Sequence, residues 1–366
     1  MAAMSFLSHI FPTPKYLTLP SVGVDVSDSS LKYIQFEQPH SHDTNLRLKA
    51  WGSTDIPEGV VERGTVHDVD KLSQVLAQVK KKTGAEYVRV SLPEERAYLF
   101  ETTIKHGTPF KEIRGLLEFK LEENVPLSPR DAYFDYDVVH AQAGEAAMEV
   151  VVAVYAKNTI NGYFEACRKA GLVPRSFEIE AQAIGRAAIP KDTTATHMIV
   201  DLGKTRTGVG IVHNGALMYT STIESGGQAF STLLREKLGD LSDDECTEIK
   251  NTRGLTNTKE NADVYGVLNS ALTTVVEEIQ TRIHYWHTRD VDRKNRNIKR
   301  VILCGGESNM AGLPQYLASA LEIPTEQAAV WNRAFSLDTF IPPITRRYSY
   351  GYATAIGLAL ADFIIE

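Results

Sequence analysis

Two stretches of the chain share one pattern of apolar and polar positions. In residues 22–34 and again in residues 198–213, an apolar stretch ends in an aspartate, a turn of glycine or small polar residues follows, and a second apolar stretch returns. Apolar strands on both sides of such a turn predict a β-hairpin. The two aspartates, Asp25 and Asp201, stand where a buried strand gives way to the turn, which is unusual in a purely structural hairpin. The repetition therefore predicts a duplicated core with a ligand between its halves.

The rest of the chain predicts a mixed α/β protein, because stretches with strand periodicity are interspersed with stretches of helical periodicity. Residues 93–177 have a rhythm of their own, strand–helix–strand–strand–helix, which predicts a compact module inserted in the first half. Further strands are expected over residues 46–56, 87–92, 97–104, 133–139, 148–155, 215–223 and 301–304. Helices are expected near residues 69–79 and over 110–123, 158–170, 178–188, 228–238, 242–254, 264–285, 313–321 and 350–365.

Composition and charge exclude several classes of protein. The length of 366 residues is long for a single core, and 43% apolar with 23% charged residues is typical of an ordinary globular protein. A net charge of −7 argues against a general nucleic-acid-binding protein. No stretch approaches the roughly 18 apolar residues that a membrane span needs, and residues 1–20 lack the features of a signal peptide. The three cysteines have no paired spacing, which indicates neither a disulfide framework nor a zinc site and fits a reducing cytoplasm.

Two polar or weakly amphipathic stretches each leave two interpretations open. Residues 1–20 are either a tail on the domain surface or a contact to a membrane surface or a partner. Residues 288–300 contain six lysines and arginines, and form either a solvated loop before a strand or a nucleic-acid patch.

The two hairpins and two glycine pairs suggest a site for a phosphorylated ligand. The hairpin turns offer backbone N–H groups and hydroxyls to anionic oxygens. Asp25 and Asp201 are suited to hold Mg²⁺ through its water molecules, because Mg²⁺ keeps most of its hydration shell. Each glycine pair, Gly226-Gly227 and Gly305-Gly306, lies between an expected strand and a helix N-terminus, where a nucleotide can approach closely.

The order of these features resembles the actin-like ATPase superfamily, and within it the PilM family of type IV pilus assembly proteins, which is related to FtsA. The resemblance covers nearly the whole chain and is carried by residues 117–127, 135–139, 170–174, 178–183 and 355–359. It implies two duplicated α/β domains around a nucleotide cleft, with an inserted subdomain in the first. The implied divisions are 1–92 (subdomain 1A), 93–177 (inserted subdomain 1C), 178–190 (connecting helix of 1A), 191–229 (2A), 230–299 (2B), 300–349 (2A, adenosine motif) and 350–366 (C-terminal helix on 1A).

The resemblance also implies the residues of a binding site for ATP and Mg²⁺. The first phosphate loop would comprise Asp25, Ser27, Asp28, Ser29 and Lys32, and the second Asp201, Gly203 and Thr205. Gly226 and Gly227 would lie by the nucleotide, Lys250 near the ribose or base, and Gly305, Gly306 and Glu307 under the purine. Glu180 would orient the attacking water beside Asp25 and Asp201, unless it is an ordinary surface residue of its helix.

Four residues depart from the family pattern in this site. One is Thr247, three residues before Lys250, where the wider family often has Glu and this chain has Glu248 one place on. Ser27 and Asp28 replace a glycine and a Ser or Thr in the first loop, so a side chain narrows the approach to phosphate and Asp28 repels a polyanion unless a metal intervenes. Glu307 stands where a third glycine is common. We therefore expect nucleotide binding and leave hydrolysis open.

By resemblance, the chain is expected to be a cytoplasmic scaffold at the inner face of the cell membrane. It would bind the N-terminal cytoplasmic peptide of a PilN-like inner-membrane protein in a groove between the first domain and its inserted module, and contact other pilus-assembly components. Membrane contact would occur only through partners, nucleic acid is not expected, and a homo-oligomer is possible. The alternatives are an active ATPase that polymerises, and a nucleotide-free adaptor of a secretion or cell-division complex.

Overall fold

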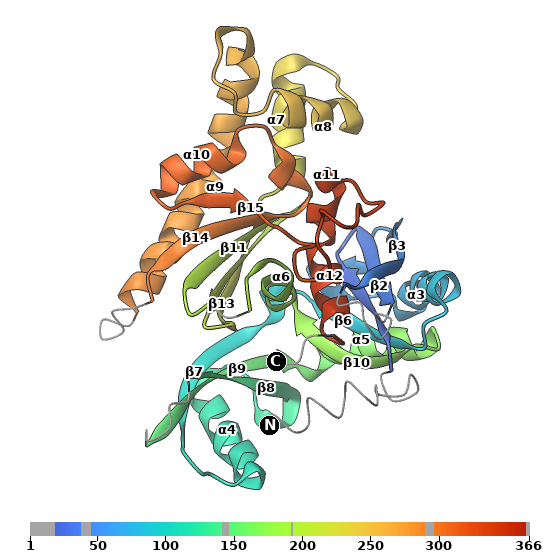
Figure 1. Cartoon of the computed structure of the whole chain (residues 1–366), viewed down its shortest axis with the longest axis vertical. Coiled ribbons are helices and arrows are strands. Elements are labelled where there is room, and N and C mark those ends of the chain that lie inside the picture. Colours follow the sequence, from blue (N-terminus) through green and yellow to red (C-terminus); the bar gives the residue numbers. More distant parts are fainter. Residues whose placement is uncertain (1–18, 38–44, 141–145, 192, 290–295, 364–366) are drawn as a thin grey trace.

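The structure is a computed structural model that describes residues 19–37, 45–140, 146–191, 193–289 and 296–363 (Figure 1). The tail expected over residues 1–20 lies outside these ranges except for its last two residues. No helix within the described ranges is long and apolar enough to cross a membrane.

The first five-stranded sheet has the order β3-β2-β1-β6-β10. The first three strands form an antiparallel meander, and β6 and β10 follow in parallel beside β1. β1 is buried along its whole length, as its apolar composition requires. The strands are β1 (Ser21–Val26), β2 (Ser30–Glu37), β3 (Arg47–Asp55), β6 (Tyr87–Leu92) and β10 (Val173–Ile179).

The second sheet repeats this arrangement strand for strand in the order β13-β12-β11-β14-β15. Again an antiparallel meander is extended by two parallel strands beside its first strand. The strands are β11 (Thr196–Leu202), β12 (Thr207–His213), β13 (Ala216–Ile223), β14 (Ile298–Cys304) and β15 (Thr325–Gln327). The identical order and pairing confirm the duplication predicted from the two hairpins.

Two helices pack between the sheets at close range. α12 (Ala353–Leu360) lies on β1 and against α6 (Glu180–Ala188). A methyl group at Gly357 would lie 1.7 Å from the Ala183 carbonyl oxygen, and one at Gly23 2.3 Å from the Ala355 carbonyl oxygen, so glycine is required at both contacts. On the outer side of the first domain, α3 (Val69–Thr83) packs on α5 (Lys157–Lys169).

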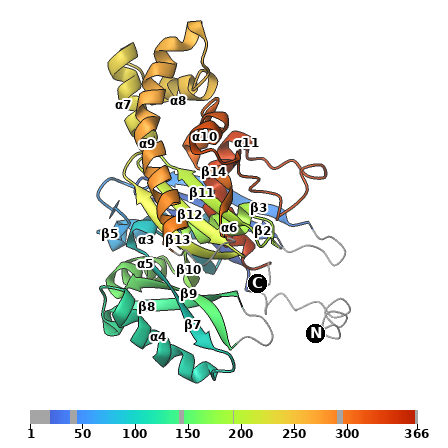
Figure 2. The same cartoon turned by 90° about the vertical axis from the view of Figure 1, so that its left-hand side faces the viewer.

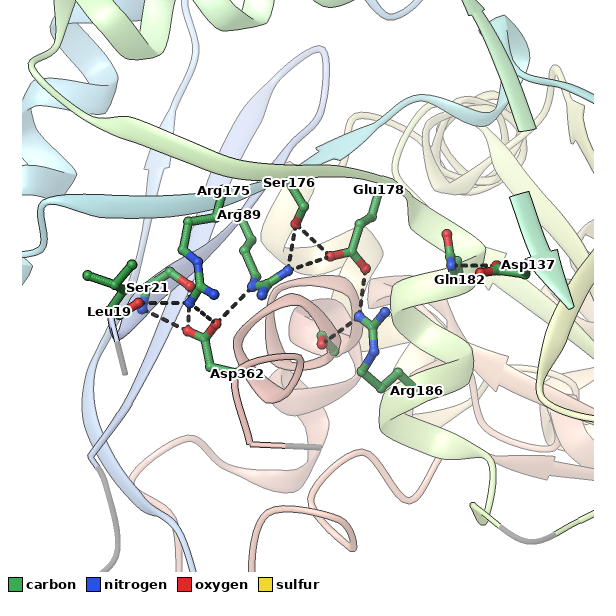
Figure 3. Close-up of polar contacts among 11 residues, drawn as sticks. Leu19, Ser21, Arg89, Asp137, Arg175, Ser176, Glu178, Gln182, Arg186 and Asp362 are labelled. Atoms are coloured by element: carbon green, nitrogen blue, oxygen red, sulfur yellow. Dashed lines mark hydrogen bonds and ion pairs between the residues drawn. The ribbon is translucent and has the colours of Figure 1, made fainter. Parts of the chain in front are cut away.

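A network of charged residues fastens the end of α12 to the first sheet (Figure 3). The Asp362 carboxylate accepts hydrogen bonds from Arg89 Nε (3.0 Å), Arg175 Nη1 (2.7 Å) and the Ser21 backbone N–H (2.8 Å). Arg89 also pairs with Glu178 at 3.3 Å. The network therefore joins the C-terminal end of the described chain to β1, β6 and β10.

The helices α7, α9 and α10 of the second domain share one apolar core with its sheet. The long helix α9 packs on α7, and α10 lies beside β15. Figures 1 and 2 show α7 and α8 at the end of the molecule opposite to the inserted module. The helices are α7 (Gly227–Leu238), α8 (Asp243–Thr252), α9 (Ala262–Thr288), α10 (Leu313–Leu321) and α11 (Arg346–Ser349).

The inserted module is a three-stranded antiparallel sheet, β7-β9-β8, covered by α4. Ile113, Leu117 and Leu121 of α4 pack on alternate valines of β9, which give the module a core of its own. The opposite face contacts the second domain, because Val139 and Val151 belong to that domain's core. The elements are β7 (Tyr98–Lys105), α4 (Phe110–Asn124), β8 (Ala132–His140) and β9 (Ala147–Ala156).

The contact between the module and the second domain is also charged. Arg296 donates to Glu101 (2.9 Å) and Glu149 (2.6 Å) of the module, and Arg289 pairs with Glu101. These two arginines belong to the basic stretch 288–300. The side chains of both form ion pairs with carboxylates of the inserted module. Residues 290–295 of this stretch lie outside the described ranges.

Some expected elements differ from the structure. The helix expected over residues 178–188 begins at Glu180, because the preceding residues form β10, an edge strand with an irregular register at Pro174. The helix expected over 350–365 is a 3₁₀ turn at Tyr350–Tyr352 followed by the eight residues of α12. The Gly305-Gly306 pair leads into a 3₁₀ turn, Gly306–Asn309, before α10 begins.

Candidate functional site

A polar cleft of about 1000 Å³ lies between the two domains. The turns of both hairpins, the start of α6 and parts of α7 and α8 line it. All residues expected in a ligand site except Gly226 line this one cleft: Asp25, Ser27, Asp28, Ser29, Lys32, Glu180, Asp201, Gly203, Thr205, Gly227, Lys250, Gly305, Gly306 and Glu307.

The two hairpin turns have the same backbone geometry. In the first, the Ser27 N–H donates to the Ser30 carbonyl at 2.9 Å; in the second, the Gly203 N–H donates to the Arg206 carbonyl at 2.9 Å. Ser27 therefore occupies the position of Gly203, as the sequence suggested. The side chain of Ser27 is held within its own turn, since its hydroxyl donates to the Ser30 carbonyl at 2.9 Å.

The residues opposite the two aspartates are different. On the neighbouring strand Asp25 is paired with Lys32, whereas Asp201 is paired with Gly208. Lys32 lowers the pKa values of Asp25 and Asp201 and so partly compensates their burial. At the second hairpin no side chain extends from the equivalent position.

Four carboxyl groups lie close together in the cleft: Asp25 and Glu94 are buried, and Asp201 and Glu180 are half-buried. Burial, followed by the neighbouring charge of Asp25, raises the pKa of Asp201 to about 6. Burial and then the charge of Asp201 raise the pKa of Glu94 to about 8. Burial together with Asp25, Glu94 and Asp201 raises the pKa of Glu180 well above its ordinary value. Lys32 and Arg206 supply positive charge to this group, yet the carboxyl groups outnumber these two cations, so the excess of potential negative charge favours a bound cation.

Arg206 of the second turn reaches across the cleft to the first domain. Its guanidinium pairs with Asp28 at 2.6 Å and with Glu95. Asp28 also accepts hydrogen bonds from the backbone N–H groups of Arg63 (3.0 Å) and Gly64 (3.2 Å). The charge of Asp28, which was expected to repel a polyanion, is thus compensated from the opposite domain.

At the other side of the cleft a buried lysine joins three elements. Lys250 Nζ pairs with Glu307 at 2.8 Å and donates to Ser231 Oγ at 3.2 Å and the Gly227 carbonyl at 3.4 Å. A methyl group at Gly227 would lie 1.9 Å from Glu307 Oε1, so the glycine makes room for this carboxylate. The lysine expected near a ribose or base is held in place by the glutamate expected under the purine.

The first glycine pair has a structural role at the start of α7. The N–H groups of Gly227 and Gln228 donate to the carbonyls of Gly203 (3.0 Å) and Lys204 (2.7 Å). They hold the second turn and are not free for an anion. Gly226 packs on the same turn, because a methyl group there would lie 2.7 Å from the Gly203 carbonyl oxygen, which explains why it does not line the cleft. By contrast, a methyl group at Gly306 would meet nothing within 4 Å, so this surface is open to a ligand.

The model of the family described as type IV pilus assembly protein PilM matches residues 23–363. The chain belongs to the PilM family. Among solved structures it is similar to a chain of the PilM-PilN type IV pilus biogenesis complex, with 20% identity and a TM-score of 0.76 over 95% of this chain and 100% of that chain.

Two more distant structures show how widely this family's fold is shared. MreB5 of Spiroplasma citri, solved with AMPPNP, has 12% identity and a TM-score of 0.53 over 92% of this chain and 94% of that chain. The ethanolamine utilization protein EutJ of Carboxydothermus hydrogenoformans has 14% identity and a TM-score of 0.52 over 96% and 90%. At these identities the similarity establishes the fold, which confirms the predicted actin-like architecture.

Two residues of the cleft were not found from the sequence. Glu94 lies two residues after the end of β6, behind Pro93, and Arg206 lies in the second turn. The rule that singled out Asp25 and Asp201, a carboxylate at the end of a buried strand, finds Glu94 only if it is extended by two residues past the strand. Nothing local distinguishes Arg206, because its partners lie in the other domain.

Proposed function

We propose that this PilM-family chain binds ATP with Mg²⁺ in the cleft and acts as a scaffold for the N-terminal peptide of a PilN-like inner-membrane protein. The observation that carries the nucleotide part is the pair of equivalent turns that face each other across one polar cleft, with the open surface of Gly306 at its other side. The turns supply polar groups for phosphates, and the glycine leaves room for a base.

The carboxyl groups of the cleft fit a hydrated Mg²⁺. Within the described ranges, no three His, Cys, Asp or Glu side chains converge as direct ligands of a metal. An ion held by Asp25 and Asp201 through its water molecules is compatible with this geometry, because Mg²⁺ takes one or two carboxylates and retains water. One buried atom, Glu94 Oε2, lacks a hydrogen-bond partner in the structure and offers a further acceptor. When bound, the ion would neutralise part of the phosphate charge.

Isothermal titration with ATP and Mg²⁺ tests the nucleotide part. We expect Asp201→Asn to weaken binding at least tenfold, because it removes a charge while preserving the shape of the side chain. Glu165→Gln, on the exposed side of α5 away from the cleft, should bind as the wild type does. If the wild-type chain shows no heat of binding, a nucleotide-free adaptor is the better description.

The partner part is supported by the similarity to a protein solved in a PilM-PilN complex. We place the peptide between the first domain and its inserted module, where Gln182 of α6 donates to Asp137 of β8 at 3.1 Å (Figure 3). The test is fluorescence anisotropy with a labelled synthetic peptide of the partner's N-terminal tail, with and without ATP and Mg²⁺, against a scrambled peptide. Equal affinity for the two peptides in both states would refute this part.

Hydrolysis is the second candidate activity, and the position of Glu180 favours it. Glu180 is the first residue of α6 and points to the cleft beside Asp25 and Asp201, where a carboxylate can take a proton from water. Burial raises its pKa, so it can act as a base only when a cation restores its ionised form. Phosphate release that is abolished in Glu180→Gln, while ATP affinity is retained, would establish turnover; equal rates in both proteins would exclude this role.

A further inference from the structure

The strands of the second sheet bring three positions into one row beside the cleft. Gly208 of β12 is paired with Asp201 on one side and with Thr222 of β13 on the other. Residues paired in this way present their side chains on the same face of a sheet. All three line the cleft.

Glu94 of the first domain lies directly over this row. A methyl group at Gly208 would lie 2.4 Å from Glu94 Oε2, so the glycine provides the space that this carboxylate occupies. Glu94 is 3% exposed and is close enough to Asp201 for the two charges to interact. The equivalent position in the first hairpin is Lys32, which would fill that space with a side chain.

Two buried polar atoms beside Gly208 lack hydrogen-bond partners. They are Glu94 Oε2 and Thr222 Oγ1, and both residues line the cleft. A buried polar atom without a partner is destabilising, so two on paired or facing residues indicate a ligand that satisfies them. The available atoms are all oxygens, two carboxylates and one hydroxyl, which is the donor set of a hard divalent cation and its water molecules.

We propose that Glu94, Thr222 and Asp201 form a subsite over Gly208 that holds a hydrated divalent cation of the Mg²⁺ type. The proposal rests on the proposed function only in that both take this cleft as the binding site. It adds Glu94 and Thr222 to the residues that hold the ion, and it makes Gly208 the residue that lets the Glu94 carboxylate approach Asp201. Because Glu94 comes from the first domain and the other three from the second, a cation here would also link the two domains.

The test uses the full chain without nucleotide, so that its outcome does not depend on ATP binding. Binding of Mn²⁺ is measured by electron paramagnetic resonance of the free ion, with Mg²⁺ as competitor. We expect Glu94→Gln and Thr222→Val to weaken Mn²⁺ binding at least tenfold and about threefold, and Gly208→Ala to reduce it strongly because the methyl group displaces Glu94. The matched control is Thr220→Val on the same strand, whose hydroxyl already donates to the Val209 carbonyl at 3.3 Å; it should bind as the wild type does.

The melting temperatures of the variants distinguish a cation-binding role of Glu94 from a purely structural one. If Glu94 holds a cation, Glu94→Gln should raise the melting temperature of the metal-free chain and lose the further rise that Mg²⁺ gives to the wild type. Wild-type affinity for Mn²⁺ in folded Glu94→Gln would overturn the proposal, as would a wild-type chain that binds no Mn²⁺. Failure of ATP binding with intact Mn²⁺ binding would instead count against the proposed nucleotide function alone.

Discussion

Replacing Arg206 by alanine should separate the two domains at the turns. The side chain is 16% exposed and is the cation that faces Asp28 and Glu95 across the cleft, both of which are less than a quarter exposed. Removing one partner of a buried ion pair costs about 3–5 kcal/mol. Because Asp28 keeps two backbone N–H donors and some contact with solvent, we expect a loss of about 2–3 kcal/mol in the free energy that holds the turns together.

Hydrogen exchange followed by mass spectrometry measures this loss at its site. The amides of Arg63 and Gly64 donate to Asp28, so a loss of about 2–3 kcal/mol should lower their protection roughly 30- to 150-fold. The control is Lys204→Ala in the same turn, whose ion pair with Asp243 is 3.8 Å long and exposed and should contribute less than about 1 kcal/mol.

A double-mutant cycle with Asp28→Asn decides whether the contact itself is responsible. A coupling energy of about 1–2 kcal/mol between Arg206→Ala and Asp28→Asn is expected for two charged residues in direct contact. Effects that add within about 0.5 kcal/mol, or unchanged protection at Gly64 in Arg206→Ala, would refute the reasoning.

Three further predictions concern the rest of the molecule. Folding raises the pKa values of Asp201 and Glu94 to about 6 and about 8, so the native chain binds more protons than the unfolded chain. Without metal, the free energy of unfolding should therefore fall from pH 5 to pH 8. A free energy of unfolding from urea denaturation that does not change over this pH range would contradict the prediction. Asp362→Ala removes the carboxylate that Arg89 and Arg175 share, which leaves Glu178 as the remaining carboxylate of Arg89, and should lower the melting temperature by several degrees; an unchanged value would show that α12 is held by its apolar contacts alone. Arg296→Ala should speed hydrogen exchange in β7 and β9 of the inserted module but not in the first sheet, and equal protection in both proteins would mean that the charged contact with the second domain is dispensable.

Local features of the site could be predicted from the sequence. Asp25 and Asp201 stand at strand ends within hairpins, and the hairpins are defined by neighbouring residues alone. The repetition of this hairpin predicted the duplicated core, and the resemblance to the actin-like ATPases implied the fold class. The strand β10 was not predicted, because it is an edge strand that contains Pro174 and is stabilised by a parallel partner, β6, far away in the sequence.

Contacts between the domains could not be predicted in this way. Asp28 was expected to repel a polyanion unless a metal intervenes, yet Arg206 of the other domain pairs with it. Glu94 follows a strand, but its burial depends on a glycine that lies on β12 of the second domain. In both cases the deciding residue is close in space and distant in sequence, so the residues around Asp28 and Glu94 give no signal of it.

The duplication itself explains why the two halves of the cleft act differently. Both hairpins place an aspartate at the end of the first strand and close the turn with the same hydrogen bond, so the backbone offers two equivalent sites. In the first half, Lys32 stands opposite the aspartate and supplies a positive charge from within the chain. In the second half, Gly208 leaves that position empty of side chain and a carboxylate from the other domain enters. Two carboxyl groups, Asp201 and Glu94, therefore meet at the second position, so that a cation bound there, as proposed above, would stabilise the contact between the domains.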